Sequence, residues 1–196
     1  PHPTFLRVRG SWDRPGVEVT PGTPAALPAL PRAGVPDRLG LARWLFSHDN
    51  PLTARVAVNR IWQEYFGRGL VASSENFGTQ GDPPSHPKLL DWLAAKFRDS
   101  GWDQKYLHRL ILTSQTYRQS SNVQPEIAER DPANVLLARQ SRLRLPAELI
   151  WDSALAVSGL LHHQVGGRSF RPEMPPGTTG FKAGGTDWEP SQGTER

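Results

Sequence analysis

The stretch from Ala54 to Phe66 constrains the fold more than any other part of the chain. Its apolar residues recur at i, i+3, i+4 and i+7, the spacing of one face of an α-helix. Asn50 and Pro51 stand where a cap and a first helical residue are favoured, and Gly67 stands where a left-handed helix end is expected. The sequence therefore predicts a helix that buries one face, made of Ala54, Ala57, Val58, Ile61, Trp62, Tyr65 and Phe66.

Comparable apolar stripes predict helices on both sides of this one. An earlier helix begins at Asp37 and stops near His48, and a later one, opened by a Ser85 cap and Pro87, stops at Gly101. We expect their inward residues to be Leu39, Ala42, Leu45 and Phe46 in the earlier helix, and Leu89, Leu90, Leu93, Ala94 and Phe97 in the later one.

Three shorter helices are predicted nearer the C-terminus. Asp103 is expected to cap the first of them, which turns Leu107, Leu110 and Ile111 inward. Residues 116–131 are polar and are expected to be irregular. Short helices then follow over 131–138 and 146–158, the last one closed by Gly159. The tryptophans within predicted helices are expected in the core: Trp44, Trp62, Trp92 and Trp151.

The two ends of the chain lack a helical pattern. Residues 4–9 alternate as a half-buried strand does, residues 17–19 could pair with them, and the prolines from Pro21 to Pro36 exclude a regular helix. We expect that proline-bearing segment to run extended over the surface of the helical part. The predicted fold is mainly α, an irregular multi-helix domain with a small N-terminal β element and an extended C-terminal arm. Its predicted parts are residues 1–36, a helical core over 37–167, and an irregular arm over 168–196.

Composition narrows the function classes. The chain has no cysteine, which excludes disulfides, thiolate catalysis and cysteine-based zinc sites. Its net charge is +4, but acidic residues are interspersed with the basic ones. A mixed solvated surface is therefore favoured, and nucleic acid is an unlikely partner. No apolar run approaches the roughly 18 residues that a membrane span needs.

Asp82 and His86 are the candidate catalytic residues. They lie in a long loop just before a predicted helix start, where a carboxylate beside an imidazole could do general acid–base work. The alternative is structural, with Ser85 capping the helix and His86 solvated. No metal site is predicted, since His162 and His163 are adjacent and point apart on most backbones.

Arginines supply the candidate ligand-binding residues, because a guanidinium binds carboxylate, sulfate or phosphate groups through two N–H donors. The candidates are Arg109, Arg118, Arg139 and Arg142. Asn59-Arg60 and His108-Arg109 lie beside apolar positions. For these residues the alternative to ligand binding is a structural role. Aromatic residues outside the apolar stripes could stack on sugar rings: Trp12, Trp102 and Trp188.

Several motifs in fixed order resemble the planctomycete-specific domain of unknown function numbered fifteen-fifty-three. The strongest is the run from Thr53 to Trp62 followed by Phe66-Gly67-Arg68-Gly69-Leu70-Val71. The resemblance covers residues 4 to about 190, and its other motifs are Asn76-Phe77-Gly78, Pro84-Ser85-His86-Pro87, Leu90-Asp91-Trp92-Leu93-Ala94, Leu107-His108-Arg109-Leu110-Ile111, residues 114–121, Ala156-Val157-Ser158-Gly159 and Val165-Gly166-Gly167.

The resemblance implies a context rather than a reaction. Domains of this family lie near the C-terminus of large exported proteins that begin with a cytochrome-c-like domain, so an extracytoplasmic location and an upstream haem are expected. This segment has no cysteine with which to attach haem, and no cofactor is expected in it. The family pattern continues past Trp188-Glu189-Pro190-Ser191, which implies a chain truncated within its domain.

Three functions follow as hypotheses. The first is a non-catalytic structural or interaction module whose partners are other domains of the same polypeptide. The second is an enzyme domain that acts on polymeric carbohydrate through residues 76–87, and the third is a helical nucleic-acid-binding domain. No catalytic motif identifies an enzyme, although catalytic groups can converge from distant positions.

Overall fold

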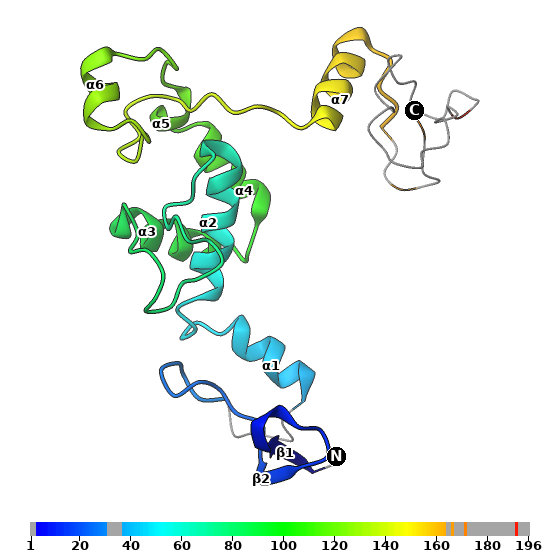
Figure 1. The fold of residues 1–196 in the computed structure, drawn as a ribbon. Helices are drawn as coiled ribbons and strands as arrows, with labels where there is room; N and C mark the ends of the chain where they lie inside the picture. The colour runs from blue at the N-terminus through cyan, green and yellow to red at the C-terminus, as the bar shows by residue number, and fades with distance from the viewer. Residues whose placement is uncertain (1–2, 31–36, 164–165, 167–170, 172–190, 192–196) are drawn as a thin grey trace, which may run out of the picture. The chain divides into compact units, whose positions relative to one another are not determined.

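The computed structural model describes residues 3–30, 37–163, 166, 171 and 191. It confirms the mainly α fold, with 44% helix and a small two-stranded N-terminal sheet (Figure 1). The chain divides into two units, Pro1–Leu143 and Arg144–Arg196. The predicted boundaries near residues 36 and 167 stay predictions.

The N-terminal sheet is a single hairpin. Strand β1 (Thr4–Arg7) pairs antiparallel with β2 (Pro15–Val19), so both predicted strands are present, although β1 ends two residues earlier than predicted and is exposed except at Phe5. A short 3-10 helix, η1 (Val8–Gly10), begins the connection between them. The pairing shifts by one residue between Phe5 and Arg7, which marks a β-bulge.

Helix α1 (Arg38–Leu45) begins as predicted, with the Asp37 carboxylate accepting from the Gly40 N–H at 2.6 Å. Its burial differs from the prediction. Trp44 is buried and its indole Nε1 donates to the Pro28 carbonyl at 2.8 Å, so the proline-bearing segment lies against α1 as expected. All four residues that were expected to point inward are exposed: Leu39, Ala42, Leu45 and Phe46.

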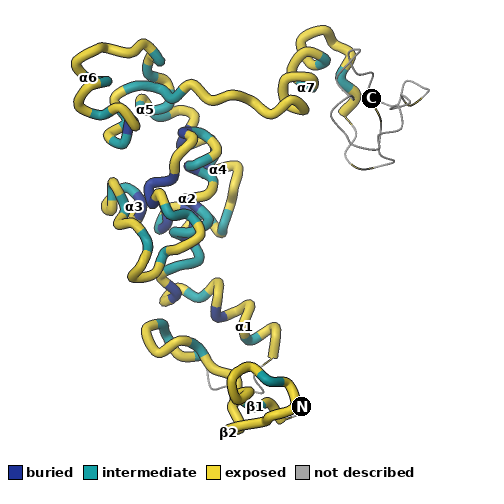
Figure 2. Tube along the Cα trace, viewed as in Figure 1, coloured by how far each residue is buried: buried dark blue, intermediate teal, exposed yellow. Residues whose placement is uncertain are grey.

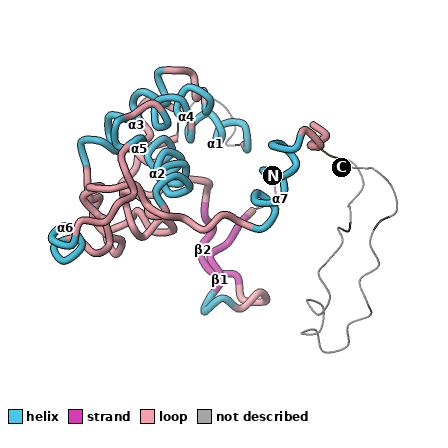
Figure 3. The backbone as a smooth tube through the Cα atoms, turned by 90° about the horizontal axis from the view of Figure 1, so that it is seen from above, coloured by secondary structure: helices cyan, strands magenta, loops and turns pink. Residues whose placement is uncertain are grey.

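Helices α2 (Thr53–Phe66), α3 (Pro87–Asp99) and α4 (Gln104–Leu112) form the core, and α3 packs against both of the others. Figure 1 and Figure 3 both show these three helices side by side. Their apolar stripes bury the expected faces, because facing stripes remove each other's apolar surface from water. The buried cluster is Val58, Trp62, Phe66, Leu70, Val71, Leu90, Leu93, Phe97, Leu107 and Ile111.

The helix ends in this core follow their local signals. The Asn50 side chain accepts from the N–H groups of Leu52 and Thr53, but α2 begins two residues later than expected, and Leu52, which directly precedes it, makes no side-chain capping bond. Gly67 ends α2 with φ 76°, a left-handed conformation that glycine adopts readily. Asp103 caps α4, as predicted, by accepting from the Tyr106 N–H at 3.1 Å.

Residues 113–143 are less regular. Short helices α5 (Gln115–Arg118) and α6 (Pro125–Arg130) occupy a stretch that was predicted to be irregular. The helix predicted over 131–138 is absent from this described stretch, where Asn134 and Leu137 take left-handed φ values of 51° and 58°. Side chains in that conformation interrupt a helix, so the prediction was wrong here.

The second unit contains helix α7 (Ala147–Ser158), which ends at Gly159 with φ 74° as predicted. None of its residues is buried, and Figure 2 draws it almost entirely as exposed. The core prediction for Trp151 was therefore wrong, since 46% of that residue is exposed. Trp92 on α3 was mispredicted in the same way, with 47% exposed.

Candidate functional site

The predicted catalytic pair, Asp82 and His86, does not form a joined site. No hydrogen bond links the two side chains, both of which lie in the described part of the chain. The Asp82 carboxylate is exposed, while its backbone N–H donates to Ser73 Oγ at 2.7 Å. His86 Nδ1 lies 3.0 Å from Ser85 Oγ. The catalytic role of this pair stays a prediction.

Ser85 does not cap α3, contrary to the prediction. The residue that precedes this helix is His86, and its side chain makes no capping bond. Both the N–H and the hydroxyl of Ser85 instead donate to the Leu70 carbonyl, at 2.8 and 3.1 Å. Ser85 thus closes the loop over residues 67–86 by joining its two ends.

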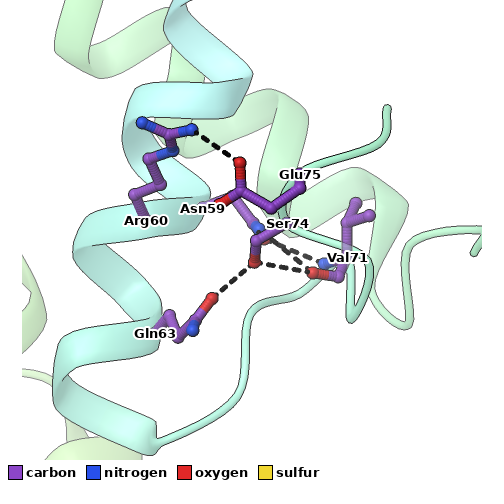
Figure 4. A network of polar contacts seen from close by, with 6 residues as sticks. All are labelled: Asn59, Arg60, Gln63, Val71, Ser74 and Glu75. Atoms are coloured by element: carbon purple, nitrogen blue, oxygen red, sulfur yellow. Dashed lines mark hydrogen bonds and ion pairs between the residues drawn. The ribbon is translucent and has the colours of Figure 1, made fainter. Parts of the chain in front are cut away.

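Asn59 is the central polar residue of the strongest motif. It is fully buried on α2, and its amide binds the backbone of Val71 from both sides (Figure 4). Asn59 Oδ1 accepts from the Val71 N–H at 2.8 Å, and Asn59 Nδ2 donates to the Val71 carbonyl at 3.0 Å and to Ser74 Oγ at 3.1 Å. The side chain therefore substitutes for a strand partner to the loop backbone.

Ser74 and Gln63 extend this network toward the surface. The Ser74 hydroxyl donates to Gln63 Oε1, and Arg60 forms an exposed ion pair with Glu75 at 3.3 Å between Nη2 and Oε2 (Figure 4). An exposed pair of this kind contributes little to stability, usually below about 1 kcal/mol. A structural role was the alternative for the pair Asn59-Arg60, and of these two residues it is Asn59 that has it.

Close packing explains why position 69 is a glycine. A Cβ at this position would lie 2.5 Å from both Asn59 Nδ2 and the Val71 carbonyl oxygen. Real Cβ atoms do not approach other atoms so closely. The motif Phe66-Gly67-Arg68-Gly69 therefore ends a helix at Gly67 and makes room for the Asn59 amide at Gly69.

The candidate arginines lie in separate places. Arg139 is half-buried and donates to the Pro132 carbonyl at 3.0 Å, and Arg142 Nε donates to Ser121 Oγ at 3.3 Å. Arg109 and Arg118 are exposed on α4 and α5. Two of the four thus hold neighbouring loop segments, and anion binding by any of them stays a prediction.

The Arg139 segment is organised by two further side chains that the sequence analysis did not select. Asp131 accepts from the N–H groups of Val135 and Leu136 at 2.8 and 2.7 Å. The buried Asn134 donates to the Arg139 carbonyl at 2.7 Å. The Leu136 amide bond is the main reason that the pKa of Asp131 lies below its usual value, helped by the Val135 amide and by the charges of Arg139 and Arg68. Only the density of Asp and Asn around Pro132 hinted at such a turn.

Tyr65, His108 and Tyr117 form a titratable cluster in the core region that the sequence analysis did not foresee. Tyr65 Oη lies 2.7 Å from His108 Nδ1, and the Tyr65 and Tyr117 rings meet edge to face at 5.6 Å. Burial, followed by the nearby Tyr117, raises the pKa of Tyr65. A neutral phenol bonded to an imidazole closes the gap between α2 and α4 without an unpaired polar group.

A small cavity adjoins the strongest motif. It lies between the end of α2 and residues 133–141, lined among others by Trp62, Phe66 and Asn134. Its volume is about 20 Å³, enough for about one water molecule. Pockets for small-molecule substrates usually measure roughly 300–1,000 Å³, so this cavity is too small for one.

The other candidates are placed as follows. Among the described residues no cluster of three or more His, Cys, Asp or Glu could hold a metal ion, and no helix has the length and apolarity to cross a membrane. Trp102 is half-buried and meets Phe46 and Phe97 edge to face, while Trp12 is 84% exposed, and sugar stacking by either one stays a prediction. Trp188 lies outside the described residues.

Comparison with known proteins identifies the family. The model of a family described as a protein of unknown function (DUF1553) matches residues 37–196. The chain therefore belongs to this family, and residues 4–36 of the expected resemblance lie outside the match. No curated protein and no solved structure significantly matches the chain.

Proposed function

We propose that this chain is a non-catalytic structural and interaction module of an exported, cytochrome-c-associated multidomain protein. Its partners are the other domains of the same polypeptide, and its location is extracytoplasmic. Any haem belongs to an upstream domain, since this segment has no cysteine with which to bind one covalently. The resemblance described above supports the export and the cytochrome association.

The exposed apolar surface of α7 is the observation that carries the proposal. Val157 is 92% exposed, and Leu149, Ile150 and Trp151 are each about half exposed. Ile150 and Val157 are seven positions apart and therefore share one face of α7, and apolar surface that is left in water marks sites of association. An apolar helix of this length is also marginal in water without packing, so α7 needs a covering partner.

Three polar residues of the first unit support the non-catalytic half of the proposal. Asn59, Ser85 and Asp131 all bind backbone groups of their own chain. A side chain whose hydrogen bonds fix a loop is occupied in the resting state, and it presents no activated group to a substrate. The cavity beside them is water-sized.

Limited trypsin digestion tests the interaction role. Arg142 and Arg144 precede α7 by a few residues, and Arg144 is exposed, so trypsin should cleave there rapidly in the free chain. In the full-length polypeptide we expect cleavage to slow at least tenfold, because docking of α7 holds its flanks. Ile150→Asp should restore rapid cleavage, while the exposed and polar Glu148→Gln should not.

Equal cleavage rates in the free chain and the full-length polypeptide would contradict the interaction role. The non-catalytic role is tested separately, by screening the full-length protein against sulfated and neutral polysaccharides. Turnover that His86→Ala abolishes in a folded protein would favour the carbohydrate enzyme instead.

A further inference from the structure

The β1–β2 hairpin is unlike the rest of the chain, because it lies outside the family match and has little cover. The match begins at residue 37, whereas the hairpin occupies residues 4–19. Every residue of β2 is exposed, as are all but one of β1 (Figure 2). A two-stranded hairpin with this exposure is at best marginally stable in water.

One face of the hairpin is apolar. Thr4 pairs with Val19 and Phe5 with Glu18, so side chains alternate between the faces from these pairs as far as the bulge before Arg7 and Pro15. Leu6, Val17 and Val19 therefore share a face with Thr4, while Phe5 and Glu18 occupy the other. Leu6 is 66% exposed and Val17 is 72% exposed. Exposed apolar residues on one face of an antiparallel sheet are suited to cover a core, and the opposite face carries Glu18 and the half-buried Phe5.

The outer edge of β1 is also open. Within the described residues the sheet has only two strands, so the outward N–H and C=O groups of Thr4–Arg7 have no strand beside them. Unpaired strand edges are often protected by proline or lysine, and β1 has neither, although it is only four residues long and adjoins a bulge. In contrast, β2 begins with Pro15, which has no N–H to offer a further strand.

Charge indicates what this edge would accept. Arg7 ends β1, and Arg9 and Arg14 lie within the connection to β2. Asp13, the acidic residue of that connection, already accepts from the Ser11 hydroxyl. The open edge is therefore basic at the end of β1, which complements a strand that carries a carboxylate.

We propose that the hairpin is the edge hairpin of a β-sheet whose other strands come from another domain of the same polypeptide. An extended strand with alternating apolar residues and an acidic residue pairs with β1, and the face of Leu6, Val17 and Val19 covers that domain's interior. This inference rests on the proposed function, which it extends by naming a β-sheet as the partner. The helical domain would then be joined to its neighbour by shared strands rather than by a linker alone.

Thiol labelling can test the inference, because the chain has no cysteine of its own. Leu6→Cys and Val17→Cys place a thiol on the apolar face, and Glu18→Cys places a matched thiol on the opposite face. Each variant is treated with N-ethylmaleimide as the free chain and as the full-length polypeptide, and the modified position is read by peptide mass spectrometry. We expect labelling at positions 6 and 17 to slow at least tenfold in the full-length polypeptide, with no change at position 18.

Each other outcome has a defined meaning. Equal labelling at all three positions in both proteins overturns the hairpin inference, and slow trypsin cleavage before α7 in the same samples would leave the proposed function standing. Protection that already occurs in the free chain, rises with its concentration and accompanies a dimer mass overturns it in favour of a second copy. Protection at position 18 alone places the partner on the wrong face and also overturns it.

Discussion

Helices α2 and α7 arise from similar sequence signals but reach opposite burial. Both carry apolar residues through their length, and both end at a glycine with a left-handed φ. Helix α2 buries Val58, Trp62 and Phe66 against α3 and neighbouring loops, whereas α7 buries no residue. The difference shows that an apolar stripe is sufficient to predict a helix, while its burial depends on a second surface that the stripe does not encode.

Leucine truncation gives the largest expected contrast between the two helical regions. Leu107→Ala, at a fully buried core position, should lower the free energy of unfolding by about 2–5 kcal/mol, since it removes buried methyl groups and leaves a cavity. Leu149→Ala on α7 should change it by less than about 0.5 kcal/mol in the free chain. Urea denaturation measures both free energies, and similar losses for the two variants would contradict the difference in burial between the core helices and α7.

Asn59→Leu should have the next largest effect. It keeps the side-chain volume roughly constant but leaves the Val71 N–H and C=O without their partner. Each unsatisfied buried group costs about 1–3 kcal/mol, so we expect a loss of roughly 3 kcal/mol in urea denaturation. The neighbouring Arg60→Ala is the control and should cost less than about 1 kcal/mol. A larger loss from Arg60→Ala would assign the structural role to the wrong residue.

Gly69→Ala should have a smaller but clear effect. Its new Cβ would collide with Asn59 Nδ2 and the Val71 carbonyl oxygen, and the shifts that relieve such overpacking cost about 1–3 kcal/mol. Gly22→Ala is the matched control, because no atom lies within 4 Å of a Cβ there. Thermal unfolding should separate the two variants, and an unchanged melting temperature for Gly69→Ala would contradict the tight Asn59 contact.

The pH dependence from Asp131 is the smallest expected effect. Its pKa is lower in the folded chain than in the unfolded one, chiefly through the Leu136 amide. The folded state therefore gains stability above the ordinary carboxyl pKa and loses it as the pH falls from about 4 through the lowered value. Asp131→Asn should flatten this acid limb in urea denaturation between about pH 2 and about pH 6. If Asp131→Asn left the loss of stability at acid pH unchanged, Asp131 would not be its source.

The core helices were predictable because their signals are local. Apolar spacing located α2, α3 and α4, and Asp103 marked the start of α4 by its short reach to the Tyr106 N–H. The helix start predicted at Asp131 failed for a physical reason that is also local. Its carboxylate binds the amides at positions 135 and 136 instead of those of a first helical turn.

The remaining errors concern contacts between distant residues. Ser85 resembles a cap in sequence, but its hydroxyl binds Leu70, fifteen residues earlier. Trp92 and Trp44 stand beside similar apolar neighbours, and only Trp44 meets a covering segment, at Pro28. The role of Asn59 likewise depends on Val71, so periodicity alone could mark it only as a polar residue among apolar ones.

Residue-resolved hydrogen exchange of the free chain tests the central contrast most directly. The account predicts that amides within α2 exchange only through unfolding of the core, while those within α7 exchange at rates near those of an unfolded peptide, because an uncovered short helix opens readily. Amides of α7 protected to the same degree as those of α2 in a monomeric free chain would contradict it, since α7 would then have its partner within this chain.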